Sequence, residues 1–366
     1  MTMQVAFRVD ASTRMGTGHV MRCLTLADAL RARGARCLFV CREHKGHLIE
    51  LIRQRGHDAI GLPLPERDGS ASNFSGDLAH SAWLGADWDD DAARTAAVLN
   101  GSPRDWLVVD HYALDARWET ALRPCYRKLM VIDDLADREH VCDLLLDQNL
   151  TEDMESRYRG KIPADCIALI GPRHALLRPE FAELRPKALA RRRTPVMERL
   201  LIFMGGSDPE NETGKAVAGV ARANGRWRHV DVVVGQGFSA LAALKDAMER
   251  LPSAALHIQT PDMAELMTVA DLAVTAAGSV TWEKCALGLP SLVAILADNQ
   301  REIAQAMHRR GALRIMGVAS DLTSGCYAKH LDELTLDEIP PMIDHAARIC
   351  DGSGAGLVLE VMEGFL

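Results

Sequence analysis

The chain has 366 residues, of which 48% are hydrophobic and 25% are charged, and its formal net charge is −8. This length favours two domains, and the composition is typical of a globular protein. The negative charge excludes a general nucleic-acid binder, so an anionic ligand would need local binding groups.

The nine cysteines are scattered, and no two form a C-x-x-C pair. This pattern predicts reduced thiols in a cytoplasmic protein rather than disulfides or a zinc site. The start, MTMQVAFRVD, lacks the apolar core of a signal peptide. No apolar run reaches the roughly 18 residues that a membrane span needs, so we expect no membrane partner.

Short apolar runs alternate with amphipathic segments in the first half of the chain. The predicted strands are 5–9, 37–41, 58–62, 106–110, 128–134 and 144–149, and the main predicted helices are 20–34, 48–56 and 89–99. The polar stretch 63–88 is predicted to be a loop, and its length suggests a function beyond connection.

A second alternating series follows, with predicted strands at 200–206, 231–235, 256–260, 271–278 and 291–296. Such patterns predict parallel sheets covered by helices on both faces. We therefore expect an α/β fold of two doubly wound Rossmann-like domains, 1–185 and 196–366, with a cleft between them. The basic stretch 186–195 is the predicted linker, and the last helix is expected to pack back on the first domain.

The sequence MGTGHVMRC, residues 15–23, follows the first predicted strand. Gly16 and Gly18 permit a tight turn and a close approach to a ligand. His19 stands at the start of the next helix, where the positive end of the helix dipole disfavours an imidazolium. The position suits a general base, although a histidine that only hydrogen-bonds a nearby carbonyl remains an alternative.

Two glycine-containing turns follow strands of the second series. In MGGSDPEN, 204–211, Gly206 and its neighbouring glycine keep side chains away from a ligand, although Ser207 also fits ordinary helix capping. In TAAGSVTWE, 275–283, Gly278 and Ser279 form a bare turn at a helix start, which suits a diphosphate. Glu283 lies one helical turn further on and could accept hydrogen bonds from a ribose diol, or it could simply complement the helix dipole.

Three other segments give weaker signals. In ADNQREI, 297–303, Asn299 could contact sugar hydroxyls, or the segment could merely cap the next helix. In VVDHY, 108–112, polar residues end a predicted strand. GQGFSA, 235–240, matches a dinucleotide pattern but lacks the expected acid after the next strand, so it is interpreted as a tight turn.

Taken together, the stretches RVDAS, MGTGHVMRCLTLADAL, VVDHY, VIDDLADR, LLLDQN, MGGSD, TAAGSVTWEKCALGLPSL and ADNQ resemble the UDP-sugar hydrolases of pseudaminic acid biosynthesis. That family is similar to the GT-B glycosyltransferases, especially the lipid-II-forming N-acetylglucosaminyl transferase. The resemblance implies that His19 activates water and that Tyr112 and Asn299 line the sugar site. It also implies a set of substrate-binding residues, which comprises Asp10, Gly16, Gly18, Arg22, Gly206, Ser207, Gly278, Ser279, Glu283 and Gln300, and it suggests 257–262 for the uracil.

The implied reaction is attack of water on the anomeric carbon of UDP-2,4-diacetamido-2,4,6-trideoxy-β-L-altropyranose, with inversion and release of UDP. We expect no cofactor and no metal, since Asp133 and Asp134 belong to the first domain, whereas the predicted diphosphate seat belongs to the second. We also expect a monomer. The alternatives are a GT-B glycosyltransferase with a UDP-amino-sugar donor and a non-catalytic UDP-sugar binding protein.

Overall fold

The computed structural model describes residues 2–65, 78–206, 208–251, 253–278 and 280–365. The chain forms two compact units. The first comprises Met1–Asn149, Asp153–Leu176 and Gly354–Leu366, and the second comprises Leu150–Glu152 and Leu177–Ser353. Among the described residues, no helix is long and apolar enough to cross a membrane.

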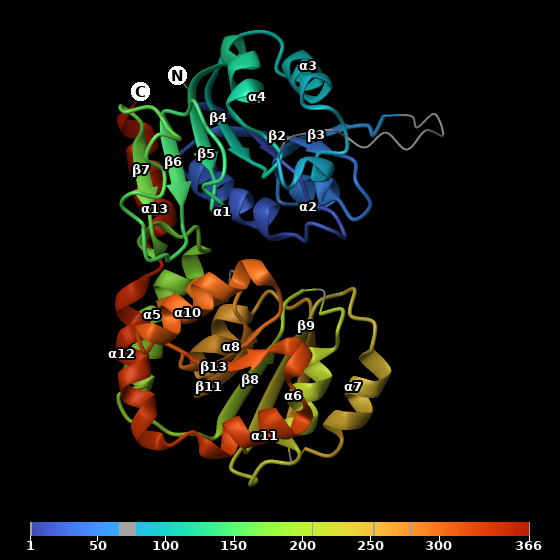
Figure 1. Ribbon diagram of the computed structural model, residues 1–366, viewed down its shortest axis with the longest axis vertical. Helices are drawn as coiled ribbons and strands as arrows, with labels where there is room; N and C mark the ends of the chain where they lie inside the picture. Colours follow the sequence, from blue (N-terminus) through green and yellow to red (C-terminus); the bar gives the residue numbers. More distant parts are fainter. Residues whose placement is uncertain (1, 66–77, 207, 252, 279, 366) are drawn as a thin grey trace. The chain divides into compact units, whose positions relative to one another are not determined.

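The first unit is built on a parallel sheet with strand order β3-β2-β1-β4-β5-β6-β7 (Figure 1). Its strands are β1 (Gln4–Val9), β2 (Arg36–Arg42), β3 (Asp58–Leu62), β4 (Arg104–Asp110), β5 (Tyr126–Ile132), β6 (Leu144–Asp147) and β7 (Ile167–Ile170). The direction of strand addition changes between β1 and β4, where Val9 pairs with Asp110. Ligands of doubly wound sheets bind outside the carboxyl ends of strands at such a switch point.

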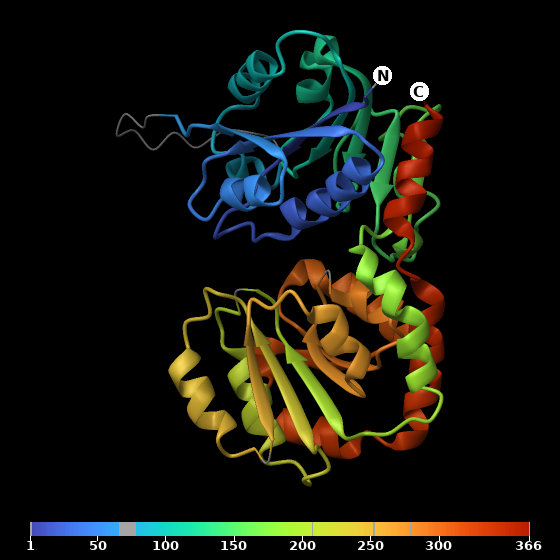
Figure 2. The same cartoon turned by 180° about the vertical axis from the view of Figure 1, so that it is seen from behind.

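Helices cover both faces of this sheet. One apolar core includes residues of α1 (Gly18–Ala32), α2 (Ile49–Gln54) and α13 (Gly354–Gly364), and the other includes residues of α3 (Trp88–Val98) and α4 (Ala116–Ala121). Figure 2 shows α13, in red, beside the first sheet, and its buried face contributes Val358 and Met362 to the core that it shares with α1. The last helix, α13, therefore packs in the first unit, together with the N-terminal part of the chain.

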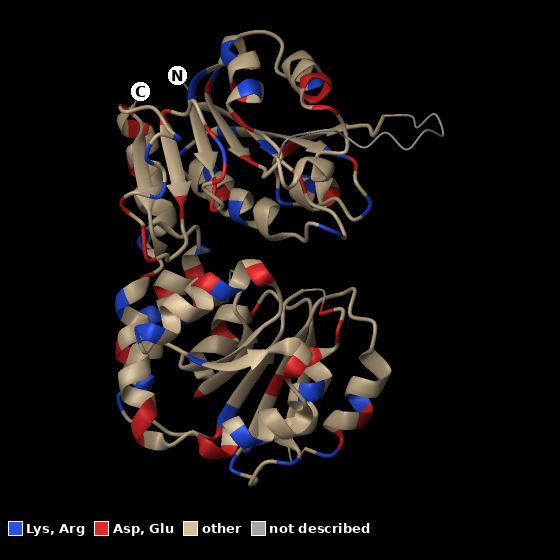
Figure 3. Ribbon diagram, viewed as in Figure 1, with Lys and Arg blue, Asp and Glu red and all other residues tan. Residues whose placement is uncertain are grey.

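The second unit has a parallel sheet with strand order β10-β9-β8-β11-β12-β13, so its switch point lies between β8 and β11. Its strands are β8 (Arg199–Phe203), β9 (His229–Val234), β10 (Ala254–Ile258), β11 (Leu272–Ala276), β12 (Ser291–Ile295) and β13 (Arg314–Val318). Its helices are α5 (Pro179–Arg191), α6 (Glu212–Val220), α7 (Leu241–Met248), α8 (Met263–Val269), α9 (Val280–Ala286), α10 (Arg301–Arg309), α11 (Ser324–Glu333) and α12 (Ile339–Ile349). Figure 3 shows charged residues interspersed along the helices, while most of each sheet is uncharged.

The basic stretch predicted as a linker is mostly helical, since α5 runs to Arg191. Within this stretch Arg192 is buried and donates to the carbonyls of Met267 and Ala270, and Arg185, one residue before the stretch, donates to those of Ala286 and Ala347. The guanidinium groups of Arg185 and Arg192 thus satisfy carbonyl groups that would otherwise lack partners.

Candidate functional site

The first candidate site lies at the carboxyl ends of β1, β4 and β5. Asp10 follows β1, and His111 and Tyr112 follow β4. Asp133 and Asp134 follow β5. Because parallel strands end at one edge, these polar side chains and the start of α1 belong to the same edge of the sheet.

The glycine turn between β1 and α1 is held by its own backbone. Gly16 has a φ of +80°, which a residue with a side chain rarely adopts, and its N–H donates to the Ser12 carbonyl at 2.9 Å. The Ser12 hydroxyl accepts from the Met15 N–H at 2.9 Å. A Cβ placed on Gly16 or Gly18 would meet no atom within 4 Å, so the space beside this turn is open.

His19 lies in the first turn of α1 and is half-buried. Its ring meets the Tyr112 ring edge-on, with centroids 4.7 Å apart. Burial lowers the pKa of His19, and the nearby Arg22 acts in the same direction, while Asp110 opposes it. The imidazole is therefore neutral at pH 7 and can accept a proton, and among the described residues none makes a hydrogen bond to it.

Arg22, from the same helix, is committed to two carboxylates. Its Nε and Nη2 donate to Asp110 at 2.6 and 2.7 Å, and its Nη1 donates to Asp134 at 3.0 Å. The remaining Asp134 oxygen accepts from the Tyr112 hydroxyl at 2.5 Å. Burial would raise the pKa of Asp134, but Arg22 and the Tyr112 hydroxyl lower it, so the carboxylate is ionised. Three nitrogens of Arg22 thus donate to two carboxylates, and the predicted contact of Arg22 with substrate stays a prediction.

Asp10, another predicted substrate ligand, is fully buried. Its side chain is 0% exposed; Oδ1 accepts from Arg8 at 2.5 Å and from the Arg42 N–H at 2.6 Å, and Oδ2 lies 3.2 Å from His111 Nε2. Burial would raise the pKa of Asp10, but Arg8 and His111 hold it well below its usual range. Since Arg8 also pairs with the buried Asp91, Asp10 is part of an internal ion network that supports the strand ends.

Sequence reasoning missed two residues that the fold brings to Tyr112. Trp83 lies in the 3₁₀ turn Ser81–Trp83, and His80 directly precedes it. The ring centroids of His80 and Trp83 are 5.3 and 5.6 Å from that of Tyr112. The only sequence signal was the length of the loop 63–88, because nothing in that stretch specifies which strand end it contacts.

The predicted nucleotide-binding residues belong to the second unit, at the ends of β8, β11 and β12. Gly206 follows β8, where a Cβ would meet no atom within 4 Å, and Gly278 follows β11. Gln300 lies in the 3₁₀ turn Asp298–Gln300, which follows β12. If Gly278 carried a Cβ, the nearest atom to it would be Nε2 of Gln300, at 4.0 Å. The structure therefore brings Gly278 and Gln300 together with open space beside them. Ser207 and Ser279 lie outside the described residues.

Glu283 is half-buried in α9, in the helix that follows the Gly278 turn. Burial raises the pKa of Glu283 to about 7; Glu180 adds to this effect and Arg178 opposes it. Asn299 is exposed, in the same 3₁₀ turn as Gln300. In the stretch predicted to face the uracil, Gln259 has a φ of +49° and its N–H donates to the Val234 carbonyl at 2.9 Å.

No group of three or more His, Cys, Asp or Glu side chains in the described part of the chain has a geometry suited to a metal ion. The Asp133 carboxylate lies 2.8 Å from Arg138 and accepts from the Tyr158 hydroxyl at 3.0 Å. This aspartate is thus already neutralised by a cation and a hydroxyl donor.

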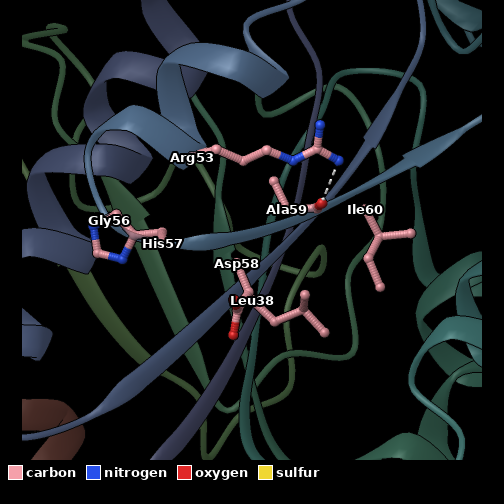
Figure 4. A pocket seen from close by; sticks show the side chains of 7 residues that line it. All are labelled: Leu38, Arg53, Gly56, His57, Asp58, Ala59 and Ile60. Atoms are coloured by element: carbon pink, nitrogen blue, oxygen red, sulfur yellow. Dashed lines mark hydrogen bonds between the residues drawn. The ribbon is translucent and has the colours of Figure 1, made fainter.

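A separate hollow lies beside the start of β3, on the first unit (Figure 4). Arg53 donates to the Ala59 carbonyl across it at 2.9 Å. The hollow is lined by Leu38, Arg53, Gly56, His57, Asp58, Ala59 and Ile60, and it contains none of the predicted site residues.

No protein-family model matches this sequence. The chain is 24% identical over 304 residues to an uncharacterized protein of Methanocaldococcus jannaschii, covering 82% of this chain but only 57% of that protein's length. It is 23% identical over 310 residues to the UDP-2,4-diacetamido-2,4,6-trideoxy-β-L-altropyranose hydrolase of Campylobacter jejuni, covering 84% of this chain and 97% of the hydrolase.

Among solved structures, the fold is similar to that of MurG from Acinetobacter baumannii, with a TM-score of 0.70, 14% identity and 99% of each chain covered. The chain thus has the GT-B fold, with two Rossmann-like α/β units, as the alternation of strands and helices predicted.

Proposed function

We propose that this protein is an enzyme that hydrolyses a UDP-sugar. The observation that carries the proposal is the neutral, half-buried His19 at an open glycine turn, with Tyr112 packed against it. The similarity to the Campylobacter hydrolase along most of both chains supports this activity, and it suggests UDP-2,4-diacetamido-2,4,6-trideoxy-β-L-altropyranose as the substrate.

The proposal assigns the sugar to the first unit and the UDP to the second. The open space beside Gly206, Gly278 and Gln300 suits a diphosphate, and Glu283 would accept hydrogen bonds from the ribose. Ser207 and Ser279 belong to the same proposed nucleotide site. Asn299 would contact the sugar from its exposed turn, whereas Asp10 and Arg22 act as positioning residues behind it.

In the proposed reaction the oxygen of a water molecule attacks the anomeric carbon while the bond from that carbon to the UDP oxygen breaks. UDP leaves with the bonding electrons, and His19 takes the proton of the water, which is worth roughly 10²–10⁴-fold in rate. Direct displacement inverts the anomeric centre. Backbone N–H groups near Gly278 would stabilise the charge on the leaving diphosphate, and we expect activity to persist in EDTA.

The test is to incubate the protein with this UDP-sugar without an acceptor and to follow UDP and free sugar by NMR. We expect equal release of both products, loss of release in His19→Asn, and unchanged UDP binding in that variant. His345→Asn, at an exposed position on α12, is the matched control and should retain full activity. Full activity of His19→Asn would rule out this histidine as the base.

A glycosyltransferase is the second candidate, because the chain shares the MurG fold over 99% of its length. A transferase would release UDP only when an acceptor is added. Saturable binding of the UDP-sugar with no turnover under either condition would instead favour a non-catalytic binding protein.

A further inference from the structure

An aromatic cluster, here called the ring platform, adjoins the candidate base. It consists of His80, Trp83 and Tyr112. The Trp83 and Tyr112 rings are stacked, with planes 29° apart and centroids 5.6 Å apart, and the His80 ring is 4.6 Å from Trp83. Because the Tyr112 ring also meets the His19 ring, the platform is in direct contact with the proposed base.

The backbone holds the platform in place. The 3₁₀ turn is closed by the Trp83 N–H donating to the His80 carbonyl at 2.8 Å, and this geometry puts residues three apart on the same side. The next residues, Leu84 to Ala86, are buried in the first unit. Between them Gly85 packs so closely that a Cβ there would lie 2.7 Å from the His44 ring. The rings are therefore positioned before any ligand arrives.

Core packing alone does not account for the exposure of the His80 and Trp83 rings, whereas the Tyr112 ring is buried, with 9% of the residue exposed. Only 5% of the residues are aromatic, and Trp106, Trp118 and Trp282 are fully buried. Trp83 and His80, by contrast, are half-buried at the same sheet edge as the open glycine turn. A partly exposed, preorganised aromatic surface of this kind is a binding surface for a ligand with apolar C–H groups.

We propose that the ring platform, through its partly exposed His80 and Trp83 rings, binds the sugar of the UDP-sugar and selects sugars that carry deoxy or N-acyl groups, while the buried Tyr112 ring supports Trp83 from beneath the surface. This inference rests on the proposed function for the identity of the ligand. The C–H face of a pyranose ring, a C6 methyl group or an acetamido methyl group can pack on an aromatic face, whereas a fully hydroxylated substituent loses hydrogen bonds to water there. Trp83 and His80 are thus specificity-determining residues, and neither takes part in proton transfer.

The test compares the affinity for UDP-2,4-diacetamido-2,4,6-trideoxy-β-L-altropyranose with that for UDP, by calorimetry in the His19→Asn background so that no substrate is consumed. We expect the unmodified platform to give tighter binding of the UDP-sugar than of UDP. Trp83→Ala should weaken UDP-sugar binding roughly tenfold, and Trp83→Phe should weaken it less, while UDP affinity stays unchanged in both variants. His80→Ala should act in the same direction as Trp83→Ala.

Trp88 provides the matched control. It is a half-buried tryptophan near the same segment, but its neighbour is the Arg117 guanidinium, 5.6 Å from the ring centroid. Trp88→Ala should leave both affinities unchanged. Melting temperatures of all variants separate misfolding from lost contacts, and Trp83→Phe keeps the test decisive if Trp83→Ala unfolds.

In the enzyme with His19 intact, Trp83→Phe should raise KM with little change in kcat. The inference is overturned if the UDP-sugar binds no more tightly than UDP, or if its advantage survives Trp83→Ala. If the UDP-sugar binds more tightly than UDP and Trp83→Ala removes this difference, but the enzyme releases no sugar, then the proposed hydrolysis is contradicted and the proposed sugar binding by the platform is supported.

Discussion

The hydroxyl of Tyr112 donates a hydrogen bond to Oδ1 of Asp134 at 2.5 Å, and Arg22 holds the other oxygen of the same carboxylate. The tyrosine is therefore fixed by a residue from the next strand end. Its ring remains available to His19 on one side and to Trp83 on the other. Asp134 thus acts on the candidate site through Tyr112 and Arg22, and its charge also opposes the lowering of the His19 pKa.

This relationship predicts that Tyr112→Phe and Asp134→Ala are coupled. Each change removes the same hydrogen bond, so each should lower kcat and destabilise the fold, by about 1 kcal/mol for the hydrogen bond itself. The double variant should be less impaired than the sum of the single variants. Urea unfolding and steady-state kinetics of all four proteins would measure the coupling, and strictly additive effects would contradict it.

The lowered pKa of His19 predicts the pH dependence of activity. Burial places this pKa below the ordinary histidine value of 6.5, and the base must be neutral to act. As the pH rises through that pKa, kcat/KM should increase and then level off before neutrality. Measurement of kcat/KM from pH 4.5 to 8 checks this, and an acid limb centred above pH 7 would argue against His19 as the base.

Arg22→Met should destabilise the protein strongly, because it leaves the fully buried Asp110 carboxylate without its cation. Breaking a buried pair from one side costs about 3–5 kcal/mol. Arg33→Met, at the end of the same helix, removes only an exposed pair with Glu363 and should cost less than about 1 kcal/mol. Urea unfolding compares the two; a stable Arg22→Met protein with lost substrate binding would restore Arg22 as a substrate ligand.

Glu283→Gln should have opposite effects on binding and on stability. With its pKa raised to about 7, the folded state keeps a proton that the unfolded state loses near pH 4.5, so wild-type stability falls as the pH rises between these values. Relative to wild type, the variant should therefore be more stable at pH 8 than at pH 4, while its affinity for UDP falls. Unfolding curves at both pH values and UDP calorimetry test this. Unchanged UDP affinity would leave Glu283 with no part in the nucleotide site.

Lys284 is buried, and its Nζ donates to the hydroxyls of Thr275 and Ser291 at 2.6 and 3.1 Å. Burial lowers the pKa of Lys284 to about 8, below its ordinary 10.5, so the unfolded state binds more protons and stability rises with pH in this window. Compared with Lys284→Met, wild type should gain about 1 kcal/mol between pH 7 and pH 9. An equal pH dependence of unfolding in the two proteins would show that folding does not lower the pKa of Lys284.

The sequence alone determined the order and type of most elements. Apolar runs that are continuous over four or more residues predicted the central strands, because a strand buried on both faces has no polar positions. The predicted strand 58–62 coincides with β3, and the predicted helix 20–34 is shifted by two residues from α1. The edge strands β7 and β13 were missed. The first is short and half-exposed, and the second contains Gly317 and a register shift against β12.

The position of His19 at a helix start beside an open glycine turn also followed from local physics, since Gly16 needs its positive φ in any tertiary context. Only the tertiary structure decided which charged side chains are buried. Asp10 and Arg22 read as ligands along the chain, yet both are largely buried among partners that include residues distant in sequence. Asp10 pairs with Arg8 and accepts from the backbone N–H of Arg42, and Arg22 pairs with Asp110 and Asp134. Long-range packing likewise brings Trp83 to Tyr112, and no local pattern specifies that contact.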